Sequence, residues 1–130
     1  MKHKNKFIFC LIMSIILLGG CGKEGEKAMY KQISQDEAKQ IMDEEQDVMI
    51  LDVRTEEEYA EGHIPDAICI PNETIDENVS ALLTDENQTI LVYCRSGNRS
   101  KQAAQKLANL GYTDIREFGG ITTWQYDIVK

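Results

Sequence analysis

One short segment of the sequence carries most of the residues that could do chemistry. Cys94 is followed closely by two arginines, Arg95 and Arg99. A thiol is a nucleophile only as its thiolate, and cationic neighbours favour the thiolate. Gly97 and Asn98 lie between the arginines and tolerate left-handed backbone, so the chain can curl around the sulfur there. The segment therefore predicts a reactive cysteine in a tight loop.

Two predicted elements would hold this loop in place. Before it, the apolar run at residues 90–92 is typical of a strand that a parallel sheet buries on both faces. After it, residues 100–110 are expected to form a helix that ends at Gly111. The first turn of such a helix has free N–H groups and the positive end of the helix dipole. Because both would point back at Cys94, they further favour a thiolate.

The rest of the chain alternates predicted strands and helices. Strands are expected at residues 30–33, 48–53, 67–70, 89–93 and 114–118. This alternation predicts an α/β fold with a mainly parallel central sheet. Ligands of such sheets bind at the carboxyl ends of the strands. Cys94 lies at one of those ends.

The predicted helices begin at recognisable signals. Ser34 with Glu37, and Thr55 with Glu58, have the spacing of a capping box, and the second of these helices is expected to end near Gly62. A further helix is predicted over residues 75–83, and its inward side chains would be those of Val79, Leu82 and Leu83. Residues 119–120 are expected to lead into a last helix that contains Trp124 as a core residue.

Composition and charge limit the possible functions. The 130 residues fit one domain, which we expect to be monomeric, and the formal net charge of -8 at pH 7 argues against nucleic-acid binding. Cys69 lies in an apolar run and is expected to be a core cysteine. Together with Cys94 and His63 it does not form a metal-ligand pattern. We therefore expect no metal and no organic cofactor.

The N-terminal segment has the features of a targeting signal. Lys2, Lys4 and Lys6 precede an apolar run at residues 7–18, and small residues then precede Cys21. This pattern resembles a bacterial lipoprotein signal, which implies cleavage after residue 20 and lipidation of Cys21. Residues 21–28 would form a polar tether, and residues 29–130 the domain, held outside the cytoplasm at the cell membrane. An ordinary secretory signal and an uncleaved anchor are the alternatives.

Three segments together resemble the rhodanese domain family. Residues 51–64 resemble the signature near the start of these domains, residues 93–100 their active-site loop, and residues 111–124 their C-terminal segment. The resemblance implies a single-domain sulfurtransferase with a three-layer fold, in which helices cover both faces of the sheet. Two departures are Asp66, where a glycine is common, and the lack of a Gly-Pro pair soon after Trp124.

The resemblance also implies a mechanism and a set of site residues. Cys94 would attack the outer sulfur of an anionic donor such as thiosulfate, carry that sulfur as a persulfide, and pass it to cyanide, a small thiol or a protein thiol. Five loop residues would bind the donor: Arg95, Ser96, Gly97, Asn98 and Arg99.

Other marked residues are expected to support the site rather than to react. Asp52 and Arg54 end a predicted buried strand beside the loop, where an ion pair or hydrogen bonds are favoured over proton transfer. Arg54 could instead bond to Glu58. For His63 we expect a structural hydrogen bond rather than a role as a base.

Two other functional classes stay open at this point. Related folds contain phosphatases with five residues between cysteine and arginine, whereas four residues separate Cys94 from Arg99. The resemblance implies that the shorter loop suits a sulfur atom and the longer one a tetrahedral oxyanion. A non-catalytic rhodanese module is the third class, but such a module would be expected to lack the loop cysteine.

Overall fold

The computed structural model describes residues 28–130 of the chain. The predicted signal peptide, Cys21 and the tether up to residue 27 lie outside the described residues. Five strands form one sheet: β1 (Lys31–Gln32), β2 (Met49–Asp52), β3 (Ile68–Cys69), β4 (Thr89–Cys94) and β5 (Asp114–Gly120). Their order is β1-β5-β4-β2-β3, and all four pairings are parallel. The predicted parallel sheet is therefore confirmed.

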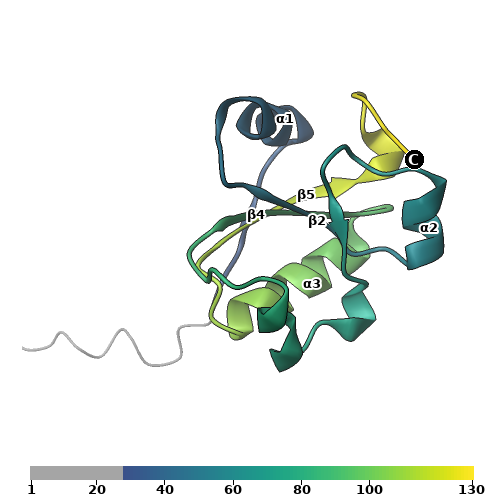
Figure 1. Ribbon diagram of the computed structural model, residues 1–130. Coiled ribbons are helices and arrows are strands. Elements are labelled where there is room, and N and C mark those ends of the chain that lie inside the picture. Colours follow the sequence, from purple (N-terminus) through teal and green to yellow (C-terminus); the bar gives the residue numbers. More distant parts are fainter. Residues whose placement is uncertain (1–27) are drawn as a thin grey trace, which may run out of the picture.

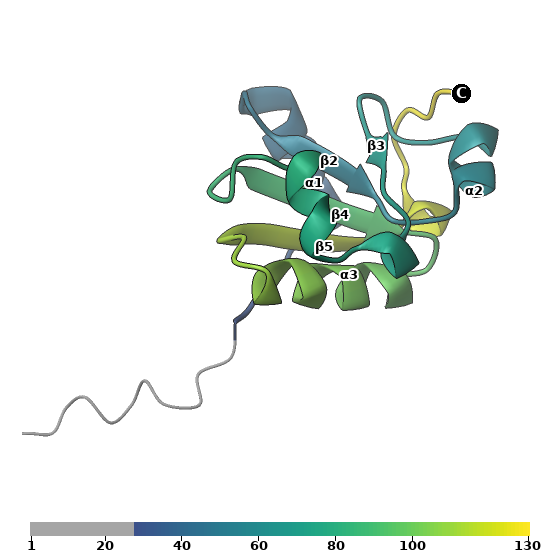
Figure 2. The same ribbon diagram turned by 60° about the horizontal axis from the view of Figure 1, so that its bottom comes forward.

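Helices cover both faces of this sheet, as predicted. Helix α1 (Gln35–Glu44) lies on one face and helix α3 (Asn98–Asn109) on the other (Figure 1). Figure 2 shows α3 running along the sheet below β4 and β5. Helix α2 (Glu56–Glu61) lies at the end of the sheet, beside the C-terminal segment. None of the helices within residues 28–130 is long and apolar enough to cross a membrane.

Strand β4 is central because its two faces form two separate cores. Its side chains alternate between the faces, as in any strand. Leu91 and Tyr93 pack with residues of α1, whereas Val92 and Cys94 pack with residues of α3. The alternation therefore directs the Cys94 side chain toward α3, whose first turn follows directly in the chain.

Thr55 and Glu58 form the predicted capping box of α2. The Thr55 hydroxyl accepts from the Glu58 N–H at 3.1 Å, and the Glu58 carboxylate accepts from the Thr55 N–H at 2.9 Å. For α1, the Ser34 hydroxyl accepts from the Glu37 N–H at 3.0 Å, which is one half of the predicted pattern. Both helices therefore start where their caps predict.

The prediction for residues 75–83 is wrong in part. The chain there forms only a short 3₁₀ helix, η3 (Glu77–Ala81), which follows another, η2 (Asn72–Thr74), and Leu82 is 64% exposed. Polar side chains bond to the local backbone: the Asp76 carboxylate accepts from the Asn78 N–H, and the Ser80 hydroxyl donates to the Glu77 carbonyl. Such local bonds compete with a longer helix.

The C-terminal helix is also shorter than expected. Only Ile121–Thr123 form a 3₁₀ helix, η4, and Trp124 follows it. The indole is nevertheless buried against Phe118, which confirms Trp124 as a core residue. Helix α3 begins at Asn98, two residues before its predicted start, and ends at Asn109; Gly111, two residues further on, has a φ of 107°.

Candidate active site

Cys94 ends strand β4 at the carboxyl edge of the sheet, and its sulfur lies inside the loop that follows. The Gly97 N–H donates a hydrogen bond to Cys94 Sγ at 3.0 Å. Gly97 has a φ of 109°, a value that favours glycine, and this conformation turns its N–H back toward the sulfur. Since α3 begins at Asn98, its N-terminal end adjoins the same sulfur. The backbone therefore forms the curl predicted from the sequence.

The outer side of the loop is tied to the C-terminal segment. The Arg95 carbonyl accepts from the Thr122 N–H at 3.2 Å and from the Thr122 hydroxyl at 3.1 Å. Gly120 lies directly against this carbonyl, since a Cβ at position 120 would be 1.9 Å from the Arg95 oxygen. The chain thus needs a glycine at position 120 to let η4 approach the loop.

The five loop residues predicted to bind substrate differ in their surroundings. The side chains of Arg95, Ser96 and Asn98 are exposed, whereas Gly97 is buried. Arg99 is half-buried and forms two bonds with Glu58, from Nη1 to Oε2 at 2.8 Å and from Nη2 to Oε1 at 3.1 Å. Arg99 is therefore held by a carboxylate of α2, and Arg95 is the loop arginine that faces solvent.

This ion pair sets the charge at one side of the loop. Chiefly because Arg99 donates to it, the pKa of Glu58 is lowered to about 2. The same hydrogen bond raises the pKa of Arg99. Both partners therefore stay charged at neutral pH. From the sequence, Arg54 was a possible partner of Glu58, but in the structure Glu58 is paired with Arg99.

Asp52 and Arg54 form a buried ion pair at the end of β2. Arg54 Nη2 lies 2.7 Å from Asp52 Oδ2, and the same nitrogen donates to the Gly62 carbonyl at 2.7 Å. The Tyr93 hydroxyl donates to Asp52 Oδ2 at 2.6 Å. Asp52 is thus bonded to β4 as well, one residue before Cys94. Asp52 and Arg54 therefore help to hold the end of β4 and the start of α2 in place.

Two residues near the sulfur were not among the predicted site residues. The hydroxyl of Ser100, in the first turn of α3, lies 3.3 Å from Cys94 Sγ. It also donates a short hydrogen bond to the carboxylate of Glu117 on β5. Both residues are buried, with exposed fractions of 0% and 2%. One signal in the sequence was available: alternation along β5 places Glu117 on the same face as the core residue Ile115.

The remaining candidates lie outside the loop. His63 Nδ1 lies 3.0 Å from the Tyr59 carbonyl, and its ring stacks on that of Tyr59. Cys69 ends β3, two strands away from Cys94 in the sheet. Within residues 28–130 no group of three or more potential metal ligands is present.

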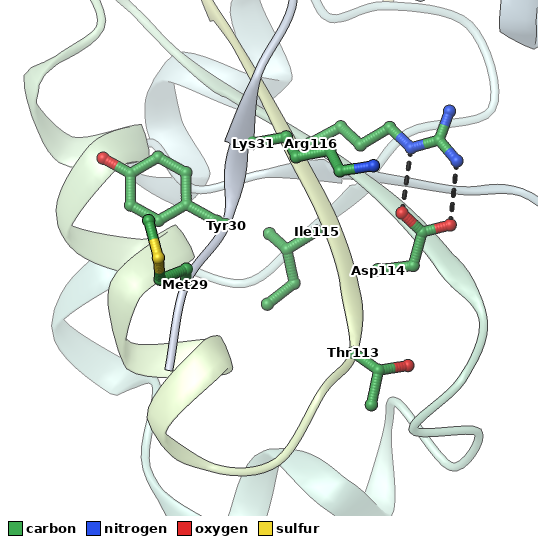
Figure 3. A pocket seen from close by; sticks show the side chains of 7 residues that line it. All are labelled: Met29, Tyr30, Lys31, Thr113, Asp114, Ile115 and Arg116. Atoms are coloured by element: carbon green, nitrogen blue, oxygen red, sulfur yellow. Dashed lines mark hydrogen bonds and ion pairs between the residues drawn. The ribbon is translucent and has the colours of Figure 1, made fainter. Parts of the chain in front are cut away.

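Two cavities help to locate the binding surface. One of about 340 Å³ adjoins the loop, and its lining includes Arg54, Arg95, Ile121, Thr122 and Ile128. Another of about 480 Å³ lies at the opposite end of the strands, between the start of β1 and the start of β5, where Arg116 is paired with Asp114 (Figure 3). Only the first adjoins the loop of Cys94.

Several known proteins are similar to this chain in sequence and in fold. The model of the rhodanese-like domain family matches residues 34–127. The chain is 36% identical over 97 residues to "Sulfurtransferase" of Allochromatium vinosum, covering 74% of this chain and 89% of that one. It is 35% identical over 98 residues to "Thiosulfate sulfurtransferase GlpE" of Coxiella burnetii, covering 75% and 89%.

A shorter alignment and two solved structures agree with these matches. "Thiosulfate sulfurtransferase PspE" of Escherichia coli is 38% identical over 71 residues, which cover 55% of this chain and 68% of that one. A structure of a rhodanese with anions from E. coli is similar with a TM-score of 0.59 at 35% identity, covering 64% and 98% of the chains. The rhodanese-like domain of an Anabaena protein has a TM-score of 0.67 at 30% identity, covering 74% of each chain. The chain therefore belongs to the rhodanese-like domain family.

Proposed function

We propose that the protein is a sulfurtransferase that moves a sulfane sulfur from a donor such as thiosulfate to a nucleophilic acceptor through a persulfide on Cys94. The observation that carries this proposal is the position of Cys94 Sγ, which accepts the Gly97 N–H at 3.0 Å beside the N-terminus of α3. A backbone N–H that donates a hydrogen bond to the sulfur stabilises a thiolate. The curated relatives named as sulfurtransferases support the same reaction class.

In the first half-reaction the Cys94 thiolate attacks the outer sulfur of thiosulfate. A bond forms between Sγ and that sulfur, the bond between the two sulfurs of thiosulfate breaks, and sulfite leaves with the electron pair. The product is a persulfide anion on Cys94. The backbone N–H groups of the loop are suited to bind this anion, as such groups do in other anion-binding curls.

In the second half-reaction a nucleophile such as cyanide or a thiolate attacks the outer sulfur of the persulfide. The sulfur leaves with the acceptor, and the electron pair of the broken bond returns to Sγ as the thiolate. Since the two half-reactions are separate, this chemistry predicts ping-pong kinetics. It uses no metal and no organic cofactor.

The donor would reach the site from the side of the exposed loop residues. Arg95 faces solvent and lines the adjoining cavity, whose other charged lining residues are Arg54, which is paired with Asp52, and the carboxylates Glu58 and Glu61. The exposed Arg95 is therefore the cation that could meet an incoming anion. Ser96, Gly97 and Asn98 provide the loop backbone, and Arg99 holds the loop through Glu58. Cys94 is 0% exposed, so we expect the loop to open when the donor binds.

The surroundings of Arg99 argue against phosphate-ester or arsenate chemistry. In a phosphate-binding loop the arginine would hold the oxyanion with its two-pronged guanidinium. Here both prongs of the Arg99 guanidinium bond to Glu58. The four-residue spacing from Cys94 to Arg99 agrees with this interpretation.

An assay of thiosulfate:cyanide sulfur transfer beside aryl-phosphate hydrolysis tests the proposal. We expect sulfur transfer by the wild-type protein, no phosphatase activity, and loss of transfer in Cys94→Ser. Phosphatase activity without sulfur transfer would contradict the reaction class. A folded protein that does neither would favour a binding module, and transfer retained in Cys94→Ser would contradict the assignment of the nucleophile.

We further propose that Cys21 is lipidated and anchors the domain outside the cytoplasm at a bacterial cell membrane. The support is the sequence alone: basic residues, an apolar run, and two glycines directly before Cys21. Two acyl chains suffice for stable anchoring. Mass spectrometry of the membrane fraction should show acylated Cys21 at the N-terminus, whereas a soluble protein with unmodified Cys21 would reject the anchor.

A further inference from the structure

Glu117 is a buried carboxylate near the nucleophile for which the mechanism above has no use. Its side chain is 2% exposed and lies on β5, facing the first turn of α3. Oε2 accepts from the Ser100 hydroxyl and, at 2.9 Å, from the Gly119 N–H, whereas Oε1 accepts from Gln32 Nε2 at 3.3 Å. Among residues 28–130 none of the ion pairs involves Glu117. Burying a carboxylate with hydrogen bonds alone is costly, so its position calls for a reason.

Hydrogen bonds connect this carboxylate to the sulfur through one hydroxyl. Ser100 Oγ lies 3.3 Å from Cys94 Sγ and is bonded to Glu117 Oε2. A serine hydroxyl has one proton and two lone pairs. When its proton points to the carboxylate, the oxygen can accept from the thiol, so the hydrogen bonds run from Cys94 through Ser100 to Glu117. No water is needed to join the two ends.

We propose that Cys94 and Glu117 share one proton through Ser100, so that Glu117 receives the proton when Cys94 becomes the nucleophile. The S–H bond breaks and its proton binds Ser100 Oγ, while the original Ser100 proton moves to Glu117 Oε2. The electron pair stays on sulfur. The negative charge thus moves from the carboxylate to Sγ, and the net charge of the buried cluster does not change. Glu117 acts through Ser100 and is a positioning residue. The inference rests on the proposed role of Cys94.

The charges around the pair favour such an exchange. Arg99, which follows the loop of Cys94, is half-buried and paired with Glu58 of α2, while Arg95 faces solvent. Glu117 faces the neutral side chains of Gln32 and Ser100. Two like charges separated by only a hydroxyl repel each other strongly in a buried site. A thiolate beside a protonated Glu117 avoids that repulsion and keeps the hydroxyl bonded on both sides.

The pH profile of Cys94 alkylation by iodoacetamide tests the proposal without a sulfur donor. A shared proton makes the two groups titrate as a pair. The wild-type rate should therefore rise in two steps. Glu117→Gln and Ser100→Ala should each show only the upper step, with a rate at pH 6 lower by about tenfold. Asp114→Asn, which removes another carboxylate of β5, should keep both steps.

Infrared difference spectroscopy supplies a readout that a purely structural role of Glu117 would not change. At pH 6 the free-thiol protein should show the carbonyl band of a protonated carboxylic acid, which alkylation of Cys94 should remove. The band should be absent from Glu117→Gln. A single-step wild-type profile, two steps in Glu117→Gln, or no such band would overturn the proposal. Because the wild-type spectrum alone suffices, the test holds even if a variant does not fold.

Sulfur transfer, measured in parallel, separates this inference from the proposed function. Two alkylation steps without transfer from thiosulfate would support the shared proton and reject the proposed reaction. Sulfur transfer with a single alkylation step would support the proposed reaction and reject the shared proton.

Discussion

Two cysteines end neighbouring parts of the same sheet edge, and they differ in almost every respect that controls reactivity. Cys69 ends β3 and Cys94 ends β4, with only β2 between these strands. Cys69 is half-buried, whereas Cys94 is fully buried. Exposure alone would therefore identify Cys69 as the reactive residue. The groups around each sulfur lead to the opposite conclusion.

The Cys69 sulfur lies in surroundings that oppose a thiolate. Its S–H donates to the Arg54 carbonyl at 3.6 Å. Burial, and then the nearby carboxylates of Asp52 and Glu56, raise the pKa of the Cys69 thiol to about 11. Cys94 instead accepts an N–H from Gly97 and lies beside a helix N-terminus and Arg99. The comparison shows that donors and local charge, rather than access to solvent, distinguish the candidate nucleophile from a passive cysteine.

The largest effect expected from this difference is in alkylation. At pH 8 a thiol with a pKa of about 11 is only about 0.1% ionised, so Cys69 should react slowly. We expect iodoacetamide to modify Cys94 more than about 100-fold faster, as measured by mass spectrometry of the two peptides. In urea the two rates should become similar. Equal rates in the folded protein would remove the basis of the comparison.

A methyl group at position 120 should weaken the Cys94 site and leave Cys69 as it is. Because the added Cβ in Gly120→Ala would lie 1.9 Å from the Arg95 oxygen, the loop has to move. Displacement of a reacting group by about 1 Å can cost roughly 100-fold in rate, so we expect kcat/KM for sulfur transfer to fall by about that factor.

Gly111→Ala is the matched control for this variant. Gly111 also has a positive φ, but it lies at the far end of α3. Its replacement should lower the melting temperature and leave kcat/KM within about twofold, since backbone strain there costs on the order of 1 kcal/mol. A Gly120→Ala protein as active as Gly111→Ala would show that the contact between η4 and the loop is unimportant.

The smallest effect expected is on stability at acidic pH. The pKa of Glu58 is lowered to about 2 by Arg99, so this pair stabilises the folded protein fully above the ordinary carboxyl pKa near 4.5. The contribution is lost as the pH falls toward 2. Because the pair is partly exposed, we expect it to be worth on the order of 1 kcal/mol.

Urea denaturation at pH 6 and pH 3 measures this contribution. Between these two values the wild-type protein should lose more unfolding free energy than Glu58→Gln, by about that amount. Lys39 and Asp43 form an exposed pair on α1, and Asp43→Asn should behave like the wild type. Equal pH dependence in wild type and Glu58→Gln would mean that Arg99 is not held by Glu58 in solution.

Local sequence signals predicted most of the fold. The strands at residues 89–93 and 48–53 were recognisable because a strand buried on both faces needs a continuous apolar run. The Thr55 cap was recognisable because its two hydrogen bonds involve residues three apart. Leu82 was assigned wrongly, since helical spacing does not reveal that local side-chain bonds shorten the helix.

The site was less predictable because its key contacts join distant parts of the chain. Cys94 and Gly97 are only three residues apart, and their hydrogen bond follows from loop composition. Glu58 and Arg99 are 41 residues apart, and a pattern of charges does not specify such a pair. The bond from Ser100 to Glu117 likewise depends on β5 lying beside α3. Contacts of this kind require the tertiary structure.

The most direct test of the account is to locate the transferred sulfur. The protein is incubated with thiosulfate in the absence of an acceptor, and its peptides are analysed by mass spectrometry under non-reducing conditions. We expect one added sulfur atom on the Cys94 peptide, none on the Cys69 peptide, and loss of that sulfur when cyanide is added. Sulfur on Cys69, or no added sulfur on either cysteine while transfer proceeds, would contradict it.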